Sequence, residues 1–235
     1  MNQSELQDRV DAARGAVAEA AGRAGRAPGD VEILPVTKGF PAAVVRAVVQ
    51  AGFRAIGENR VGEAEAKRAE LTDLEDAGLA WHMIGHLQRN KAARAVELFD
   101  RIDSLDSLRL ARRLDAVAAS AGRTELPVLV QVNASGEASK GGFSIDGVVE
   151  AVREIRTLER LRVQGLMTMA PFEASEAELR DVFGRTRRGL EACRAELPGL
   201  DARELSMGMS GDFEIAVEEG ATQVRLGTAL LGERR

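Results

Sequence analysis

Short apolar runs alternate with longer amphipathic segments along the chain, and this alternation constrains the fold more than any other feature of the sequence. Eight of the apolar runs are typical of strands bounded by glycine or polar residues. They are Glu32–Thr37, Phe53–Ile56, Ala80–Ile84, Arg101–Ser104, Pro127–Val132, Arg162–Met167, Glu204–Met207 and Thr222–Leu226. Because helical patterns separate successive strands, the order predicts a parallel sheet, and eight such units in 235 residues suit a (β/α)8 barrel.

Helical segments fill the intervals between these strands. The first helix precedes the first strand, where apolar residues recur at three- and four-residue spacing and Ser4 and Gln7 form a predicted capping box. A second capping box, Ser175 with Glu178, begins a long helix. We therefore predict one domain over 1–235, a single α/β barrel of the TIM type with an extra N-terminal helix. A doubly wound open sheet is the structural alternative, since a strand count from pattern can be wrong by one or two.

Composition narrows the class of protein. The net charge is -5 with acidic and basic residues interspersed, and the aromatic residues are seven phenylalanines and one tryptophan, so neither a basic footprint nor a base-stacking platform for nucleic acid is expected. The single cysteine, Cys193, excludes an internal disulfide framework and is interpreted as a packed helix residue. No apolar run approaches the roughly 18 residues that a membrane span needs. We expect a cytoplasmic protein that binds no membrane.

In a barrel, functional groups gather at the carboxyl ends of the strands, and polar or glycine residues fall at those ends here. They are Lys38, the Gly57-Glu58-Asn59 and Gly85-His86 runs, Asn133, Thr168 with Met169, the Gly208-Met209-Ser210 run, and Gly227 with Thr228. The last two groups follow the seventh and eighth strands, where barrels commonly hold a phosphate. Ser210 is predicted to be a helix N-cap, and Gly227 and Thr228 open a short helical turn with free N–H groups. Ordinary turns are the alternative interpretation of each motif taken alone.

Lys38 and Arg225 add a second kind of chemistry. Lys38 could be a solvated surface lysine, but it lies at the end of the first strand, and Arg225 shares a strand face with Gly227 two residues later. A lysine, a phosphate cradle and an interior arginine are what pyridoxal phosphate needs for its aldehyde, phosphate and ring nitrogen. An ion pair with a carboxylate at the barrel floor is the alternative for Arg225.

Several stretches resemble the pyridoxal phosphate homeostasis family, relatives of the alanine racemase barrel. These stretches are "VTKGFP", "IGENRVGEA", "WHMIGHLQRNK", "VLVQVNASGEASKGGF", "GLMTMAP" and "LSMGMSGDFEIAVEEGATQVRLGTALLG". The resemblance implies pyridoxal 5'-phosphate as the cofactor, Lys38 as its Schiff-base lysine, Arg225 near the ring nitrogen, Ser210, Gly227 and Thr228 at the phosphate, and Asn59 in the pocket wall. Arg60 stands where an aromatic residue often follows Gly-Glu-Asn, and Gly211-Asp212 stands where two acids are common.

The two histidines fall on or just after the third strand. His82 is a candidate for the pocket lining and His86 a weaker one, and without cysteine or histidine partners they predict no metal site.

Three functions fit these residues. The resemblance implies a protein that carries or buffers pyridoxal phosphate, with apo-enzymes as possible recipients, and it suggests a monomer. An amino-acid racemase, or another enzyme using the same cofactor on this barrel, is the first alternative. The resembling racemases use a tyrosine from a separate β domain as second base; the chain has no tyrosine and reaches Arg235 soon after the eighth strand, so we expect no catalytic residues. A phosphate-ester enzyme that uses Lys38 directly is the second alternative.

Overall fold

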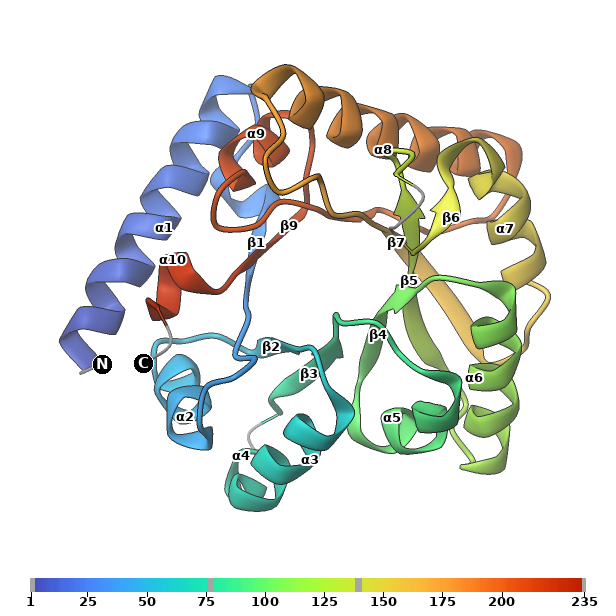
Figure 1. Ribbon diagram of the computed structural model, residues 1–235, viewed down its shortest axis with the longest axis horizontal. Helices are drawn as coiled ribbons and strands as arrows, with labels where there is room; N and C mark the ends of the chain where they lie inside the picture. The colour runs from blue at the N-terminus through green and yellow to red at the C-terminus, as the bar shows by residue number, and fades with distance from the viewer. Residues whose placement is uncertain (1–2, 76–77, 138–140, 234–235) are drawn as a thin grey trace.

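The computed structural model describes residues 3–75, 78–137 and 141–233. Part of the "VLVQVNASGEASKGGF" stretch, residues 138–140, lies outside the described residues. Figure 1 shows helices arranged around a central set of strands. The predicted (β/α)8 barrel is confirmed, because the strands form one parallel sheet in the order β1-β9-β8-β7-β5-β4-β3-β2 and a bridge between Val36 and Gly57 links its two ends.

All eight predicted strands are present, with ends that differ by a few residues. They are β1 (Glu32–Pro35), β2 (Ala55–Glu58), β3 (Ala80–Met83), β4 (Arg101–Leu105), β5 (Leu126–Asn133), β7 (Leu161–Met167), β8 (Glu204–Ser206) and β9 (Gln223–Leu226). The sequence did not indicate β6 (Phe143–Ser144), a two-residue strand that pairs with the end of β5. A pairing this short has no periodicity of its own to detect.

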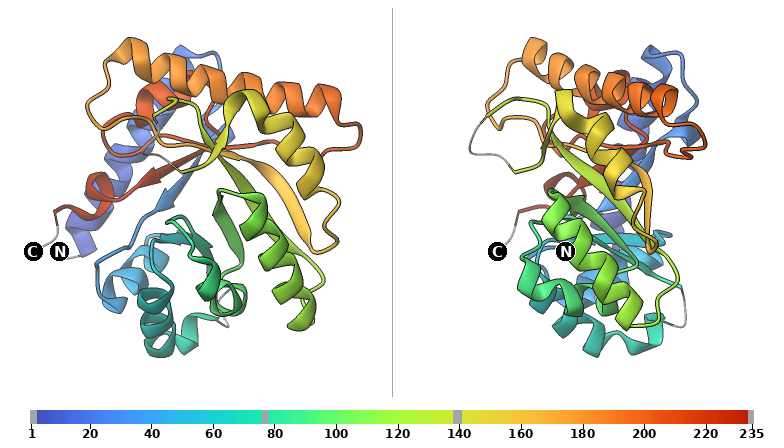
Figure 2. Two further views of the ribbon diagram at one scale, coloured as in Figure 1. Left: turned by 45° about the vertical axis from the view of Figure 1, so that its right-hand side comes forward. Right: turned by 90° about the vertical axis from the view of Figure 1, so that its right-hand side faces the viewer.

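Helices cover the outside of the barrel. They are α1 (Gln3–Arg23), α2 (Ala42–Gln50), α3 (Val61–Glu70), α4 (Thr72–Glu75), α5 (Ala92–Leu98), α6 (Leu108–Ser120), α7 (Val148–Ile155), α8 (Glu176–Glu196), α9 (Phe213–Glu218) and α10 (Thr228–Leu231). Short 3₁₀ helices occupy Pro28–Asp30, Arg89–Lys91 and Ile145–Gly147. The extra helix α1 lies beside α10, and Figures 1 and 2 both show the two chain ends close together.

Of the two predicted capping boxes, the structure contains one and not the other. The Ser175–Glu178 capping box is confirmed: the Glu178 N–H donates to the Ser175 hydroxyl at 3.4 Å, and the Ser175 N–H donates to the Glu178 carboxylate at 2.8 Å. The Ser4 capping box was wrong, because α1 already includes Gln3 and Ser4 therefore lies within its first turn.

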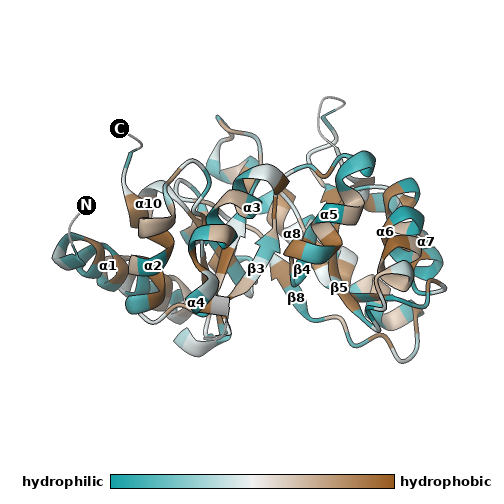
Figure 3. Cartoon of the chain, turned by 90° about the horizontal axis from the view of Figure 1, so that it is seen from below, coloured by the Kyte–Doolittle hydropathy of each residue, from teal (hydrophilic) through white to brown (hydrophobic). Residues whose placement is uncertain are grey.

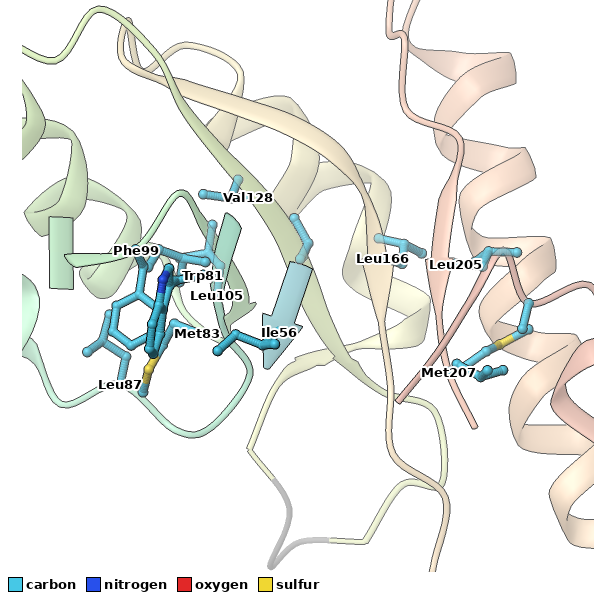
Figure 4. Close-up of a cluster of buried hydrophobic side chains, with 14 of the residues drawn as sticks. Ile56, Trp81, Met83, Leu87, Phe99, Leu105, Val128, Leu166, Leu205 and Met207 are labelled. Carbon is cyan, nitrogen blue, oxygen red and sulfur yellow. The ribbon is translucent and has the colours of Figure 1, made fainter. Parts of the chain in front are cut away.

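The main hydrophobic core lies between the strands and the helices. Figure 3 shows β5 coloured as hydrophobic, whereas α1 and α6 carry hydrophobic and hydrophilic residues on the same helix. In Figure 4, Trp81 and Met83 of β3 lie near Phe99 and Leu105, and Leu166 and Leu205 lie across the sheet. Each of these side chains is at most 5% exposed. This layer packs the helices against the outside of the barrel. Other side chains occupy the inner faces of the strands.

The barrel interior is smaller and mixed in polarity. Its apolar part is a separate cluster of Leu34, Val36, Ala55 and Ile84. Buried polar residues on other strands complete the interior, among them His82, Asp103, Gln131, Ser206, Gln223 and Arg225. Since buried polar groups are costly unless they find partners, the arrangement of these residues decides what the interior can do.

Candidate functional site

Lys38, Gly227 and Thr228 line one cavity at the carboxyl ends of β1 and β9. The cavity has a volume of about 280 Å³, and Val36 and Phe40 also line it. Lys38 follows β1 on a turn in which Gly39 has a φ of 74° and the Phe40 N–H donates to the Thr37 carbonyl at 3.1 Å. Three residues chosen from separate parts of the sequence therefore meet at one place.

Closure of the barrel brings these residues together. β1 and β9 are the first and last strands of the barrel, and they pair in parallel with Leu34 opposite Arg225 and Pro35 opposite Leu226. The Val36 N–H donates to the Leu226 carbonyl at 2.9 Å, just before both strands end. The turns that carry Lys38 and Gly227 consequently follow two neighbouring strands, β1 and β9, which lie side by side in Figure 1.

Ser210 joins the same group, but not in the predicted way. The residue at the N-cap of α9 is Asp212, and its carboxylate accepts the Met209 N–H at 2.5 Å. Ser210 instead accepts the Ala229 N–H in the first turn of α10 at 3.1 Å. The N-cap prediction was wrong by two residues, because α9 begins only at Phe213. The hydrogen bond nevertheless ties the loop after β8 to the helix start after β9.

Several backbone donors at this junction have no partner among the residues that the structure describes. The N–H groups of Ser210, Gly211, Gly227 and Thr228 make no hydrogen bond within the part of the chain that the structure describes. Gly208 supports the first of these turns: its φ is 95°, and a Cβ there would lie 2.6 Å from the Ala216 Cβ. Unpaired N–H groups converging from two turns can receive an anion with several oxygens, such as a phosphate.

Arg225 lies inside the barrel below this junction. It donates to the Ser206 carbonyl at 2.6 Å, the Ser206 hydroxyl at 3.0 Å and the Thr168 carbonyl at 2.8 Å. Burial lowers the pKa of its guanidinium to about 10, so it stays protonated at neutral pH. No carboxylate forms an ion pair with it among residues 3–75, 78–137 and 141–233, so the alternative of a floor ion pair is not supported. Its neutral partners leave a positive charge available inside the barrel.

A second arginine occupies the amino-terminal end of the interior and is fully engaged. We call Arg101, Asp103, Glu204 and Gln223 the floor network. Arg101 donates to Asp103 at 2.7 Å, to Gln223 at 3.0 Å and to Glu204. The Ser206 hydroxyl donates to the Gln223 side-chain oxygen at 3.1 Å. A continuous set of hydrogen bonds thus runs from the floor network through Ser206 to Arg225.

The histidines and Asn59 lie apart from the Lys38 cavity lining. His82 is buried within the barrel, 3.8 Å from Asp103, and its Nδ1 atom has no hydrogen-bond partner within the described residues. His86 is exposed at the rim, where its Nδ1 lies 2.9 Å from Asp106. Asn59 is half-buried after β2, where a Cβ at Gly85 would overlap its backbone. A pocket role for Asn59 or His82 stays a prediction. No group of metal-ligating side chains was found in the described residues.

A buried charge cluster lies behind the Lys38 turn and was not predicted from the sequence. Lys67 of α3 donates to Glu58 at 2.6 Å, to Glu63 at 2.8 Å and to the Thr37 carbonyl at 2.7 Å. Glu58 is fully buried and Lys67 is 5% exposed. The only local signal is the four-residue spacing of Glu63 and Lys67, which favours an ion pair on a helix surface. Nothing in that spacing indicates burial.

Comparison with known proteins agrees with this fold. Residues 12–235 match the model of the family described as alanine racemase, N-terminal domain. The class is therefore that of the barrel found at the amino end of alanine racemases.

Within this class the similarity is more specific. The chain is 42% identical over 231 residues to the pyridoxal phosphate homeostasis protein of Pseudomonas aeruginosa, covering 98% of this chain and 96% of that protein. The chain belongs to the pyridoxal phosphate homeostasis protein family.

Solved structures support the same assignment. The structure of PipY from Synechococcus elongatus PCC7942 with pyridoxal phosphate bound has a TM-score of 0.81 and 41% identity, covering 92% of this chain and all (100%) of that one. Alanine racemase from Clostridium difficile 630 has a TM-score of 0.73 at 17% identity, covering 98% of this chain and 57% of that chain. The second likeness shows the fold alone. Separately, none of the helices in the described residues combines the length and apolar character of a membrane span.

Proposed function

We propose that this protein binds pyridoxal 5'-phosphate and carries or buffers it, without catalysing turnover. The observation that supports this most directly is the shared cavity of Lys38, Gly227 and Thr228. An amine, unpaired backbone donors and a buried guanidinium match the aldehyde, the phosphate and the ring nitrogen of this cofactor. The names of the relatives and the cofactor bound to PipY agree with the proposal.

Each residue has a separate task in this proposal. Lys38 provides the amine for a Schiff base, and it approaches the cavity from β1. Ser210, Gly227 and Thr228 bind the phosphate through one hydroxyl and the unpaired N–H groups. Arg225 donates a hydrogen bond to the ring nitrogen. Asn59 and His82 are retained as pocket residues, Asn59 at the wall and His82 deeper in the barrel.

Arg225 also supports a carrier over an enzyme. Pyridoxal phosphate, when bound, offers an electron sink for reactions at an amino-acid α-carbon, and that sink is strongest when its ring nitrogen is protonated. An arginine can only donate hydrogen bonds and stays protonated, so Arg225 leaves the ring nitrogen without a proton. A racemase also needs a base on each side of the α-carbon, and the chain contains no tyrosine to act as the second. We therefore expect no catalytic residues.

The proposal extends to the setting of the protein. The whole chain, residues 1–235, acts as one cofactor-binding domain, as a monomer in the cytoplasm, and apo-enzymes that need pyridoxal phosphate are its recipients. A charge of -5, distributed without a basic patch, agrees with a protein that meets neither nucleic acid nor membrane.

Absorbance and transfer measurements test the proposal. Purified protein saturated with pyridoxal phosphate should show the visible band of an imine and lose it on borohydride reduction. An apo-enzyme should recover activity faster or more completely from this loaded protein than from the same concentration of free cofactor. The absence of any imine band in saturated protein would refute pyridoxal phosphate binding through Lys38 and leave the phosphate-ester alternative.

Deuterium exchange at the α-carbon separates a carrier from an enzyme. With saturating cofactor, D- and L-amino acids should exchange well below the typical enzymic range of ~1 to 10³ per second. Rapid exchange that requires Lys38 would favour the racemase alternative.

A further inference from the structure

The turn that carries Lys38 is held from behind by three buried or half-buried side chains. Glu58 ends β2, and Glu63 and Lys67 lie one turn apart on α3, which follows β2 directly. We call Glu58, Glu63 and Lys67 the clamp. None of the three lines the Lys38 cavity. Their side chains meet on the outer side of the strands, whereas Lys38 reaches the cavity from the other side.

The clamp contacts the residue on each side of Lys38. The ammonium of Lys67 donates to the Thr37 carbonyl at 2.7 Å. The Glu63 carboxylate accepts the Gly39 N–H. The Thr37 hydroxyl donates to Glu58 at 2.5 Å. Since both neighbours of Lys38 are tied to the same three side chains, the direction in which the Lys38 side chain leaves the backbone depends on the clamp.

The charges of the clamp are coupled by burial. Lys67 uses its three N–H groups on Thr37, Glu58 and Glu63, which satisfies the ammonium completely. Glu58 has one buried oxygen with no hydrogen-bond partner in the described residues, and burial raises the pKa of its carboxyl despite the opposing effect of Lys67. The pKa of Glu63 is lowered, because hydrogen bonds from Lys67 and Gly39 outweigh its partial burial. Removing Lys67 would leave two carboxylates close together with no cation between them.

We infer that Lys67, with Glu58 and Glu63, is a positioning group that orients Lys38 for attack on the cofactor aldehyde. The inference rests on the proposed function, in which Lys38 forms the Schiff base. A displacement of about 1 Å in a reacting group can lower the reaction rate by about 10²-fold. The clamp touches no part of the cavity itself, so it acts through the backbone of residues 37–39.

The principal test replaces Lys67 and measures amide hydrogen exchange and the affinities for two ligands. In the protein without cofactor, Lys67→Met should accelerate hydrogen exchange of the Gly39 and Phe40 amides by about tenfold or more, because the turn loses its anchor. In the loaded protein, the apparent affinity for pyridoxal phosphate, read from the imine band, should fall by about tenfold or more. Pyridoxine 5'-phosphate has an alcohol in place of the aldehyde and cannot form an imine, so its affinity should stay within about twofold.

Two further variants and one matched control keep the test decisive. Glu63→Gln retains an oxygen that can accept the Gly39 N–H but removes the negative charge that faces Lys67. Its effects on exchange and imine affinity should be smaller than those of Lys67→Met and in the same direction. If Lys67→Met does not fold, Glu63→Gln decides the test. Lys67→Arg keeps the cation and should restore part of the imine affinity. Glu65→Gln is the matched control, because Glu65 lies on the same helix and pairs with Arg94 at the surface. It should change neither exchange nor imine formation.

Different outcomes overturn different parts of the argument. Unchanged exchange of the Gly39 and Phe40 amides in Lys67→Met and Glu63→Gln would refute the clamp, whether or not cofactor binds. Equal losses of affinity for pyridoxal phosphate and pyridoxine 5'-phosphate would also refute it, since they would indicate a general disturbance of the site. Failure of the wild-type protein to form an imine would refute the proposed function instead, and the exchange measurement would still decide whether the turn is clamped.

Discussion

The two ends of the barrel use polar groups in opposite ways. At the amino-terminal end, the floor network satisfies its own groups: Arg101 donates to Asp103, Glu204 and Gln223. At the carboxyl-terminal end, the turns after β8 and β9 leave four backbone N–H groups without partners in the described residues. The comparison shows that similar donors can close a structure or receive a ligand, depending on whether the protein supplies an acceptor.

Electrostatics reinforces this contrast. Burial alone would lower the pKa of Arg101, but Asp103 and Glu204 outweigh it and raise the pKa. Arg225 has only neutral hydrogen-bond partners, and burial lowers its pKa to about 10. The first charge is neutralised within the fold, whereas the second is still available to a ligand. This agrees with the general division of such barrels into a stabilising face and a functional face.

The largest expected effect comes from Lys38→Ala at the rim. The variant should lose the imine band completely, because its amine is removed, while its unfolding free energy changes by less than about 0.5 kcal/mol, since Lys38 is half-buried and lies outside the hydrophobic core. Absorbance with excess cofactor and urea unfolding measure the two quantities. A variant that keeps the band would direct attention to another lysine.

Arg101→Met at the floor should have the reverse pattern. It leaves Asp103 fully buried without its cation, which should lower the unfolding free energy by about 3–5 kcal/mol. In the folded protein, cofactor affinity should change little, because Arg101 lies at the opposite end of the barrel from Lys38. Arg162→Met, at a half-exposed surface pair with Glu125, is the control. If Arg101→Met weakens cofactor binding more than folding, the two ends are not separate in function.

His82 should produce a smaller effect that depends on pH. Burial lowers its pKa below the ordinary 6.5, and the opposing charge of Asp103 does not restore it. Between the folded-state pKa of His82 and its unfolded-state value of about 6.5, the unfolded protein binds more protons than the folded protein. The contribution of neutral His82 to the free energy of unfolding is therefore fully present above about pH 6.5 and is lost as the pH falls through the folded-state pKa.

The change of unfolding free energy with pH that His82 causes should reach at most about 1.4 kcal/mol per pH unit, and His82→Gln should remove this slope. Urea unfolding between pH 5 and pH 8 measures this slope. His86→Gln alters an exposed histidine and should leave it unchanged. A slope that persists in His82→Gln would mean that the floor carboxylates cause it.

The smallest effect should come from Ser210→Ala. The Ala229 N–H loses its acceptor, so one hydrogen bond within the proposed phosphate site disappears. Affinity for pyridoxal phosphate should fall by about 1 kcal/mol, roughly fivefold, while affinity for unphosphorylated pyridoxal should hold. Titration with both compounds makes the comparison. Equal losses would remove the phosphate assignment.

Local patterns in the sequence were enough for most of the fold. The capping box of Ser175 and Glu178, the end of the first strand before Lys38, and the turn that opens at Gly227 all depend on residues within a few positions of one another. Side-chain spacing along helices and strands reports such neighbours directly. The eight strands and their alternation with helices could therefore be predicted before any coordinates, and the general rule that such barrels gather functional groups at the carboxyl ends of their strands put Lys38, Gly227 and Thr228 on one rim.

Only the tertiary structure decided which partners the polar side chains have. Ser210 meets Ala229, 19 positions away, and Arg101 meets Gln223, 122 positions away. The role of Lys67 behind the Lys38 turn was likewise invisible, because its spacing from Glu63 fits an exposed pair equally well. Such contacts depend on closure of β1 against β9 and on the packing of α3 against β2, which join distant segments at angstrom precision. Local periodicity states which face a residue occupies, and the closed barrel determines which residue it meets there.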